Sequence, residues 1–194
     1  MPARDRGTEE LIKETAKKIF FAEGRFNATT QDIADAAGVA RTVIHYYFRS
    51  KDALFKQVFD EAMAETTEKM DGALCSDKPF KEKVADFIDV FTDEISVYPY
   101  KESFFISEIN SHGFVQQKKE HPGVVQLLKD IQGAIDREEI KPIRPVNFLI
   151  NMISLISYPM LTRRLLQDSI ELKDIGFEQL MQERKKMILD ILFN

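Results

Sequence analysis

The chain has 194 residues, of which 44% are hydrophobic and 30% are charged, and its formal net charge is −5 at pH 7. This length is enough to bury a full core in one large or two small domains, and the composition is that of an ordinary soluble protein. A single cysteine, Cys75, excludes an intramolecular disulfide framework, and the N-terminus shows no secretory signal, so we expect a cytoplasmic protein.

The charge is distributed unevenly along the chain. A net negative charge argues against nucleic-acid binding, which is dominated by phosphate neutralisation. Through Asp52, however, nine basic residues stand against eight acidic ones, whereas the remainder holds 18 and 24. The acidic residues are therefore concentrated outside the N-terminal region, which gives modest support to a DNA-facing surface there.

The N-terminal residues 1–7 have no apolar periodicity and are expected to form a mobile arm. Arg4 and Arg6 could reach a minor groove, although a disordered terminus is the favoured interpretation. Thr8 is a candidate cap for a first helix that ends near Gly24. The apolar side of this helix is formed by Ile12, Ala16, Ile19 and Phe20.

The stretch from Thr29 to Lys51 predicts a helix, a tight turn and a second helix. Thr29 or Thr30 can cap the first of these helices. Its inner face consists of Ile33, Ala34 and Ala37. Gly38 stands where a chain that leaves a helix most often needs a left-handed residue, and Val39 is expected to fill the gap between the two helices.

The second helix is expected to begin at about Ala40 and to turn Ile44 and Phe48 inward. Its outer arc then consists of Arg41, Thr42, His45 and Tyr46. These polar side chains have no core to fill, but they can touch base edges and phosphates, as the second helix of a helix-turn-helix does in a major groove. An ordinary solvated helix face is the alternative.

These residues also resemble a known family. The segment AGVARTVIHYYFRSKDALF, preceded by TTQDIA and by a helix containing KKIFFAEGRF, is similar to the N-terminal DNA-binding region of TetR-type transcriptional regulators over about Leu11 to Phe55. Two positions depart from the family pattern. Ala40 stands where a Ser or Thr helix cap is usual, which weakens an expected phosphate contact, and His45 stands where Tyr is common, which changes the operator that is read.

Eight candidate DNA contacts follow from the arc and from the resemblance. Arg41 and Thr42 would meet base edges, and Arg is best suited to guanine. His45 and Tyr46 could read base edges or thymine methyls, and Val43 touches a methyl or simply packs. The residues that resemble the phosphate contacts of the family are Thr30, Tyr47 and Lys51.

A long helix is expected to connect this module, residues 1–52, to a second body, residues 77–194. Ser50 caps its start, and it can run over residues 51–74 without a breaker, which at 1.5 Å per residue is about 35 Å. In the second body we expect helices from Phe80 to the residues before Pro99, from Tyr100 to about Ser111 and from Val124 to Glu139, with a loop from His112 to Gly123.

Two last helices are expected at Val146 to about Leu166 and at Phe177 to about Leu192. The first is apolar on nearly every side, so it must be buried or lie in lipid. Polar residues keep its apolar run shorter than the ~20 residues that span a bilayer, which favours a helix shared by the core and a subunit interface. The resemblance implies that these two helices form a four-helix homodimer interface. Pro159 should kink the first helix and free a carbonyl near Leu155.

Fifteen Phe, seven Met and no Trp make the second body rich in flexible apolar side chains. They form either an ordinary helical core or a ligand cavity between helices. The resemblance favours a cavity for a small, apolar effector. The candidate lining residues are Phe87, Phe91, Phe104, Phe105, Met152, Ile156 and Tyr158.

Other sites are less well supported. His112 and His121 with Glu108 and Glu120 match no familiar metal-ligand spacing, so we expect no metal and no cofactor. Cys75 lacks a second thiol for redox sensing, and no nucleophile, phosphate-loop or metal spacing indicates an enzyme.

The predicted protein is all-α with two domains, a homodimeric repressor that a small molecule releases from a palindromic operator. The alternative is a helical small-molecule-binding or adaptor protein whose N-terminal unit contacts protein rather than DNA.

Overall fold

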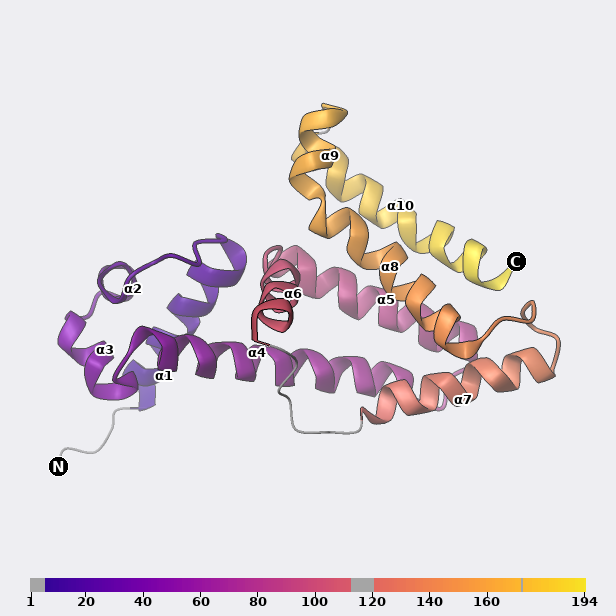
Figure 1. Cartoon of the computed structure of the whole chain (residues 1–194), viewed down its shortest axis with the longest axis horizontal. Coiled ribbons are helices and arrows are strands. Elements are labelled where there is room, and N and C mark those ends of the chain that lie inside the picture. The colour runs from indigo at the N-terminus through magenta and orange to yellow at the C-terminus, as the bar shows by residue number, and fades with distance from the viewer. Residues whose placement is uncertain (1–5, 113–120, 172) are drawn as a thin grey trace.

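The computed structural model describes residues 6–112, 121–171 and 173–194, and of residues 108–112 and 175 it describes the backbone alone. Within these ranges the chain forms ten α-helices and one π-helical turn, and no strand. Two groups of helices lie toward opposite ends of the long helix α4 (Figure 1). The predicted all-α class, with a small N-terminal unit and a larger helical body, is confirmed.

The N-terminal unit begins with α1 (Arg6–Lys17), which continues into a π-helical turn (Lys18–Ala22), and contains α2 (Thr30–Ala37) and α3 (Arg41–Phe48). Thr8 lies inside the first turn of α1 because the helix already starts at Arg6, so the prediction that Thr8 caps it was wrong. The buried core of the unit includes all four residues predicted for the inner side of this helix, Ile12, Ala16, Ile19 and Phe20.

The turn between α2 and α3 forms as its residues predict. Thr29, rather than Thr30, caps α2, because its Oγ1 accepts a hydrogen bond from the Asp32 amide (3.2 Å) while the Asp32 carboxylate accepts one from the Thr29 amide (2.7 Å). Gly38 then adopts a left-handed conformation with φ of 66°. Val39 is half-buried against the core of the unit, so it does fill the gap between the helices.

Helix α4 (Lys51–Leu74) contributes to the apolar cores of both units. Ser50 caps it by accepting a hydrogen bond from the Ala53 amide at 3.1 Å. Its first half buries Leu54 and Val58 in the N-terminal core, whereas Leu74, at its end, belongs to the core of the larger body. The position of the larger body is therefore coupled to the N-terminal unit by one continuous helix.

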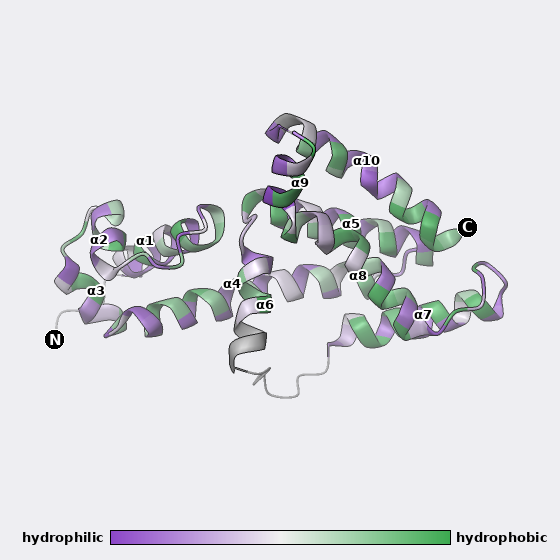
Figure 2. Cartoon of the chain, turned by 45° about the horizontal axis from the view of Figure 1, so that its top comes forward, coloured by the Kyte–Doolittle hydropathy of each residue, from purple (hydrophilic) through white to green (hydrophobic). Residues whose placement is uncertain are grey.

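The larger body packs its helices around a second apolar core. These helices are α5 (Phe80–Val97), α6 (Lys101–His112), α7 (Pro122–Asp136), α8 (Pro145–Leu161), α9 (Arg163–Ser169) and α10 (Asp174–Phe193). Figure 2 shows that hydrophobic residues are frequent along α5, α7, α8 and α10, where these helices face one another. Fully buried side chains of this core include Leu127, Ile131, Phe148, Met152 and Ile156.

Two predictions about this body need correction. The single helix expected from Val146 to about Leu166 is broken at Thr162 into α8 and α9, which are bent by 61°. The loop expected from His112 to Gly123 is shorter, since Pro122 and Gly123 already begin α7, where a proline in the first turn loses no hydrogen bond. Residues 113–120 lie outside the described part of the chain.

Pro159 lies inside α8, as predicted, and it lacks the N–H that would bond to the carbonyl of Leu155. That carbonyl instead accepts a hydrogen bond from Nη2 of Arg184 in α10, at 2.6 Å. The freed backbone group therefore links the last two long helices.

Within the described residues, no single helix has both the length and the apolar composition needed to cross a membrane. Only α8 and α9 taken together would meet that requirement, and they are bent relative to each other.

Candidate nucleic-acid interface and ligand cavity

Helix α3 presents the polar arc that its sequence predicts. Arg41, Thr42, His45 and Tyr46 are exposed, with Tyr46 at 53% of its full exposure, while Ile44 and Phe48 on the opposite side are buried. A large aromatic side chain that is half-exposed beside a cation and a hydroxyl can contact base edges and methyl groups. The face lies at the end of the molecule that is farthest from α10 (Figure 1).

Two side chains of the arc are held in place by hydrogen bonds. Nε of Arg41 donates to Oγ1 of Thr30 in α2 at 3.2 Å, and Thr30 itself is only 8% exposed. Nδ1 of His45 lies 3.0 Å from the backbone carbonyl of Arg49, which selects the tautomer with a proton on Nδ1. The guanidinium of Arg41 retains free donors for a base or a phosphate because only Nε is engaged.

The other candidate contacts lie at the edge of this surface. Val43 and Tyr47 are half-buried against the core of the N-terminal unit, and the rings of Tyr46 and Tyr47 meet edge to face at 5.1 Å. Nζ of Lys51 donates to the carbonyl of Phe26 at 3.0 Å, which positions its charge near the start of α4.

Sequence reasoning missed one neighbour of this surface. A shallow hollow on α3 that contains Thr42, Tyr46 and Tyr47 is also lined by Thr8 and Ala40. Thr8 lies within the first turn of α1, and this helix places its side chain beside the hollow. Arg4 and the other residues of the expected arm before Arg6 lie outside the described residues.

Comparison with known proteins agrees with this geometry. The model of the family described as "Bacterial regulatory proteins, tetR family" matches residues 12–58, which span the core of the N-terminal unit and the exposed arc of α3. Over these residues the chain is similar to the DNA-binding region of the TetR family.

Relatives of this chain extend the similarity beyond the N-terminal unit. The HTH-type transcriptional regulator YhgD of Bacillus subtilis (strain 168) is 28% identical over 143 residues, which cover 71% of this chain and 74% of that protein. The solved structure of the TetR-family regulator PfmR from Thermus thermophilus has a TM-score of 0.60 at 16% identity and covers 97% of this chain and 96% of that one. The fatty acid degradation regulator FadR from Bacillus halodurans has a TM-score of 0.59 at 14% identity, with coverage of 96% and 97%. At such identities the two structures show the shared fold.

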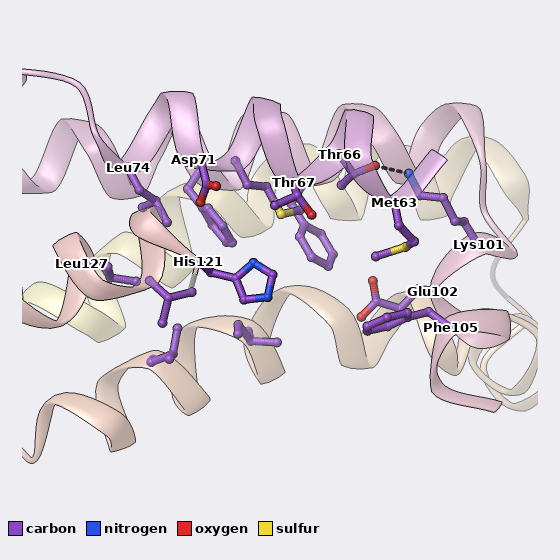
Figure 3. A pocket seen from close by; sticks show the side chains of 16 residues that line it. Met63, Thr66, Thr67, Asp71, Leu74, Lys101, Glu102, Phe105, His121 and Leu127 are labelled. Carbon is purple, nitrogen blue, oxygen red and sulfur yellow. Dashed lines mark hydrogen bonds between the residues drawn. The ribbon is translucent and has the colours of Figure 1, made fainter. Parts of the chain in front are cut away.

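The larger body of the chain contains a cavity of about 250 Å³ between α4, α5, α6, α7 and α8 (Figure 3). Its wall is mostly apolar, as is common for small-molecule sites. Of the predicted lining residues, Phe87, Phe91 and Phe105 contribute to the wall.

The structure places the other four predicted lining residues elsewhere. Phe104 turns into the N-terminal unit, where its ring centroid lies 4.5 Å from that of Phe55. Met152 and Ile156 are fully buried in the core behind the cavity, and Tyr158 is 61% exposed. The residues of α8 that line the cavity are Leu149 and Ile153. Each lies three positions before one of the predicted residues, Met152 and Ile156.

Several polar residues of the wall were missed by the sequence analysis. Thr66, Thr67 and Asp71 project from α4, which had been interpreted only as a connecting rod, and Lys101 and Glu102 from the start of α6. A signal was present, because polar residues that recur three to four positions apart on an otherwise apolar helix face require partners.

Lys101 belongs to a buried network at one end of the cavity. Its Nζ donates to Oγ1 of Thr66 at 2.5 Å and to the carboxylate of Glu94, which also accepts a hydrogen bond from Lys69. Burial alone would raise the pKa of Glu94, but the hydrogen bonds from Lys101, Lys69 and Thr66 outweigh it and lower this pKa to about 2. The Glu94 carboxylate is therefore charged and compensates Lys101.

Asp71 and His121 also line the cavity, and the ring of His121 lies near its middle (Figure 3). Oδ1 of Asp71 accepts a hydrogen bond from the backbone amide of Gly123 at 2.9 Å, in the first turn of α7. Among the described residues, no group of three or more His, Cys, Asp and Glu could hold a metal ion. The side chains of His112, Glu108 and Glu120, which the sequence analysis considered with His121, lie outside the described residues.

Proposed function

We propose that this TetR-family regulator is a ligand-responsive repressor that binds a palindromic DNA operator as a homodimer. The observation that carries the proposal is the polar, half-aromatic arc of α3, which is exposed and has Arg41 braced against Thr30. A solvated helix face would not require such bracing, whereas a side chain that reads a base gains from a fixed orientation.

The side chains divide into two roles on the duplex. Arg41 and Thr42, at the start of α3, would meet base edges, with His45 and Tyr46 one turn further along. Thr30, Tyr47 and Lys51 would position the helix through phosphates, since Thr30 begins α2, Lys51 begins α4 and Tyr47 lies near the end of α3. Val43, which is half-buried, would contribute packing more than contact with a methyl group.

The homodimer would form through α8 and α10. Both helices expose large apolar side chains on the larger body, and they lie side by side (Figure 1). These side chains are Val146, Ile150, Met187 and Ile191. Exposed apolar residues on two adjacent helices are typical of an interface that another copy covers. Such a dimer could set two α3 helices about 34–36 Å apart, the spacing of successive major grooves.

Ligand response would pass through α6, because adjacent residues of this helix face different units. Phe105 lines the cavity, whereas Phe104 packs among the aromatic rings of the N-terminal unit. The start of α6 is also tied to that unit by the Tyr100 amide, which donates to the carbonyl of Phe21 at 3.0 Å. A ligand that shifts α6 would therefore change the position of α3 relative to its copy.

The required energy limits what counts as an effector. Moving the operator-bound population from 99:1 to 1:99 requires a ligand that prefers the released state by roughly 5.5 kcal/mol. A less selective ligand would only attenuate repression.

The domain division that fits this mechanism is a DNA-binding domain over residues 1–52, a connecting helix over 51–74, and a ligand-binding and dimerisation domain over 77–194. The two apolar cores support this division, since one lies mainly among α1–α3 and the other among α5, α7, α8 and α10. Helix α4 contributes to both cores, so the domains would move with it rather than independently.

The decisive experiment is the selection of bound duplexes from a random pool by the purified protein. We expect a palindromic consensus that becomes less strict at one position in each half when Arg41→Ala is used, with a loss of about 1–3 kcal/mol for the preferred sequence. Arg144→Ala removes one exposed positive charge far from α3 and should leave the consensus unchanged. No enrichment at low salt would reject DNA binding and favour a protein-binding adaptor.

A further inference from the structure

Among the residues that the structure describes, no cation forms an ion pair with one carboxylate of the cavity. Glu102, in the first turn of α6, points into the cavity near Met63 and Phe105 (Figure 3), and no described residue forms a salt bridge with it. The hydroxyl of Ser157 in α8 lies close enough to favour its charged form, yet Ser157 is only 4% exposed and its hydroxyl has no hydrogen-bond partner within the described part of the chain. A half-buried carboxylate and a buried hydroxyl therefore meet here with few partners, an arrangement that costs stability until a donor arrives.

Lys101, the residue before Glu102, does not supply the missing charge. Its ammonium is directed at Thr66 (Figure 3), and Lys101 is 7% exposed. Its charge is already matched by Glu94. A ligand carboxylate would have to compete with Glu94 for Lys101 while lying next to Glu102, so like-charge repulsion disfavours it.

The second carboxylate of the cavity is satisfied in a different way. Asp71 accepts the amide of Gly123, and it lies at the N-terminal turn of α7, where backbone N–H groups and the helix dipole stabilise a negative charge. No backbone amide or cation among the described residues compensates Glu102 in this way. Burial accordingly raises the pKa of its carboxyl group, against the opposing effects of Ser157 and Lys101.

The surrounding wall suits a cation with a hydrocarbon chain. Aromatic rings from α5 and α6, those of Phe87, Phe91 and Phe105, line the same cavity. The face of an aromatic ring attracts an ammonium group when it is shielded from water, and a carboxylate beside such rings adds a full opposite charge. The volume of about 250 Å³ limits the ligand to a small molecule.

We propose that this cavity selects small apolar cations, with a protonated amine against Glu102 and Ser157 and a hydrocarbon chain between the phenylalanine rings. The role of such a cation as effector rests on the proposed function, whereas its binding to the cavity does not. The proposal predicts that acids of the same chain length are poor ligands.

Three probes with the same chain test the charge preference by calorimetry on the full-length protein at neutral pH: octylammonium, octanoate and 1-octanol. We expect octylammonium to bind about tenfold or more tightly than 1-octanol and octanoate to bind most weakly. Glu102→Gln should weaken octylammonium by about tenfold and leave 1-octanol unchanged, because the amide keeps the shape and removes the charge. Glu68→Gln, an exposed position on α4, should change neither affinity.

Glu102→Asp provides a second variant that retains the charge, so it should keep a preference for octylammonium over 1-octanol even if shorter reach lowers the affinity. Equal or stronger binding of octanoate, an octylammonium affinity that Glu102→Gln leaves intact, or failure of all three probes to bind would each overturn the proposal. Release of operator DNA by octanoate alone would overturn the cation preference while leaving the ligand-responsive regulator in place. Absence of any DNA binding would remove the proposed function without affecting the calorimetric result.

Discussion

The two units of this protein differ in how far along the chain the contacts that shape their candidate sites reach. In the N-terminal unit, the capping box joins Thr29 to Asp32, and the brace on α3 joins Arg41 to Thr30, eleven positions away. In the larger body, Arg184 reaches the carbonyl of Leu155 across 29 positions. A surface that meets a duplex of constant shape can be built from local geometry, whereas a cavity between helices depends on how distant elements pack.

Helix α6 contacts both units. Its first residues take part in the buried network of Lys101 and Glu94, Phe104 enters the aromatic cluster of the N-terminal unit, and Phe105 lines the cavity. Helix α6 therefore contributes both to the N-terminal unit and to the wall of the cavity. Substitutions on either side of it show whether the two units are coupled as the contacts indicate.

The largest expected effect comes from Phe104. Phe104→Ala should destabilise the protein by about 2–4 kcal/mol, since it leaves a cavity against Phe26 and Phe55, and it should weaken DNA binding by loosening the N-terminal unit. Phe105→Ala is the matched change one residue later and should mainly lower affinity for a cavity ligand. Urea unfolding followed by circular dichroism, together with calorimetry, measures both. Indistinguishable behaviour of the two variants would remove the distinction between the faces of α6.

The next effect tests a long-range contact of the larger body. Arg184→Met should cost about 1–3 kcal/mol, because the Leu155 carbonyl, which Pro159 leaves without a helical partner, would lose its donor. Pro159→Ala restores an N–H at that position, so Arg184→Met should cost about 1 kcal/mol less in the Pro159→Ala background. Additive free energies of unfolding in the double-mutant cycle would show that the proline and the arginine act independently.

The third effect concerns the network at the boundary and depends on pH. The pKa of Glu94 is about 2 in the folded protein, against 4.5 for the ordinary group, so the unfolded chain takes up the proton first as the pH falls. The stabilisation is therefore complete above about pH 4.5 and is lost on going down to about pH 2, with an expected size of about 1–2 kcal/mol after allowance for solvent screening.

Glu94→Gln should make the free energy of unfolding depend less on pH over this range, and Glu68→Gln should not. Unfolding by urea at pH 2.5, 3.5, 4.5 and 7, values chosen to span the titration, supplies the curve. Parallel acid limbs for wild type and Glu94→Gln would show that the network contributes no pH-dependent stability.

The smallest effect tests the local geometry of the N-terminal unit. Gly38→Ala should cost about 1 kcal/mol through backbone strain alone, because φ is +66° and a Cβ there would meet no atom within 4 Å. Gly72→Ala, inside α4 and equally free of neighbours, should instead stabilise by about 0.5–1 kcal/mol. Thermal midpoints that move in the same direction for both variants would contradict a strained turn at Gly38.

The sequence by itself determined the turn and the polar arc of the N-terminal unit. A cap at Thr29, a left-handed Gly38 and the inward period of Ile44 and Phe48 all act within a few residues, so the chain has little choice in how they combine. The free carbonyl beside Pro159 was likewise predictable, because the missing N–H is a property of the residue.

Only the tertiary structure decided which side chains line the cavity. Helical periodicity assigns Phe104 and Phe105 to different faces of α6, but it cannot tell which face meets the N-terminal unit and which the cavity, since that depends on where α6 crosses α4 and α8. That Glu102 has no ion-pair partner among the described residues could not be predicted either, because whether a carboxylate finds an opposite charge depends on neighbours that the packing of distant helices brings to it.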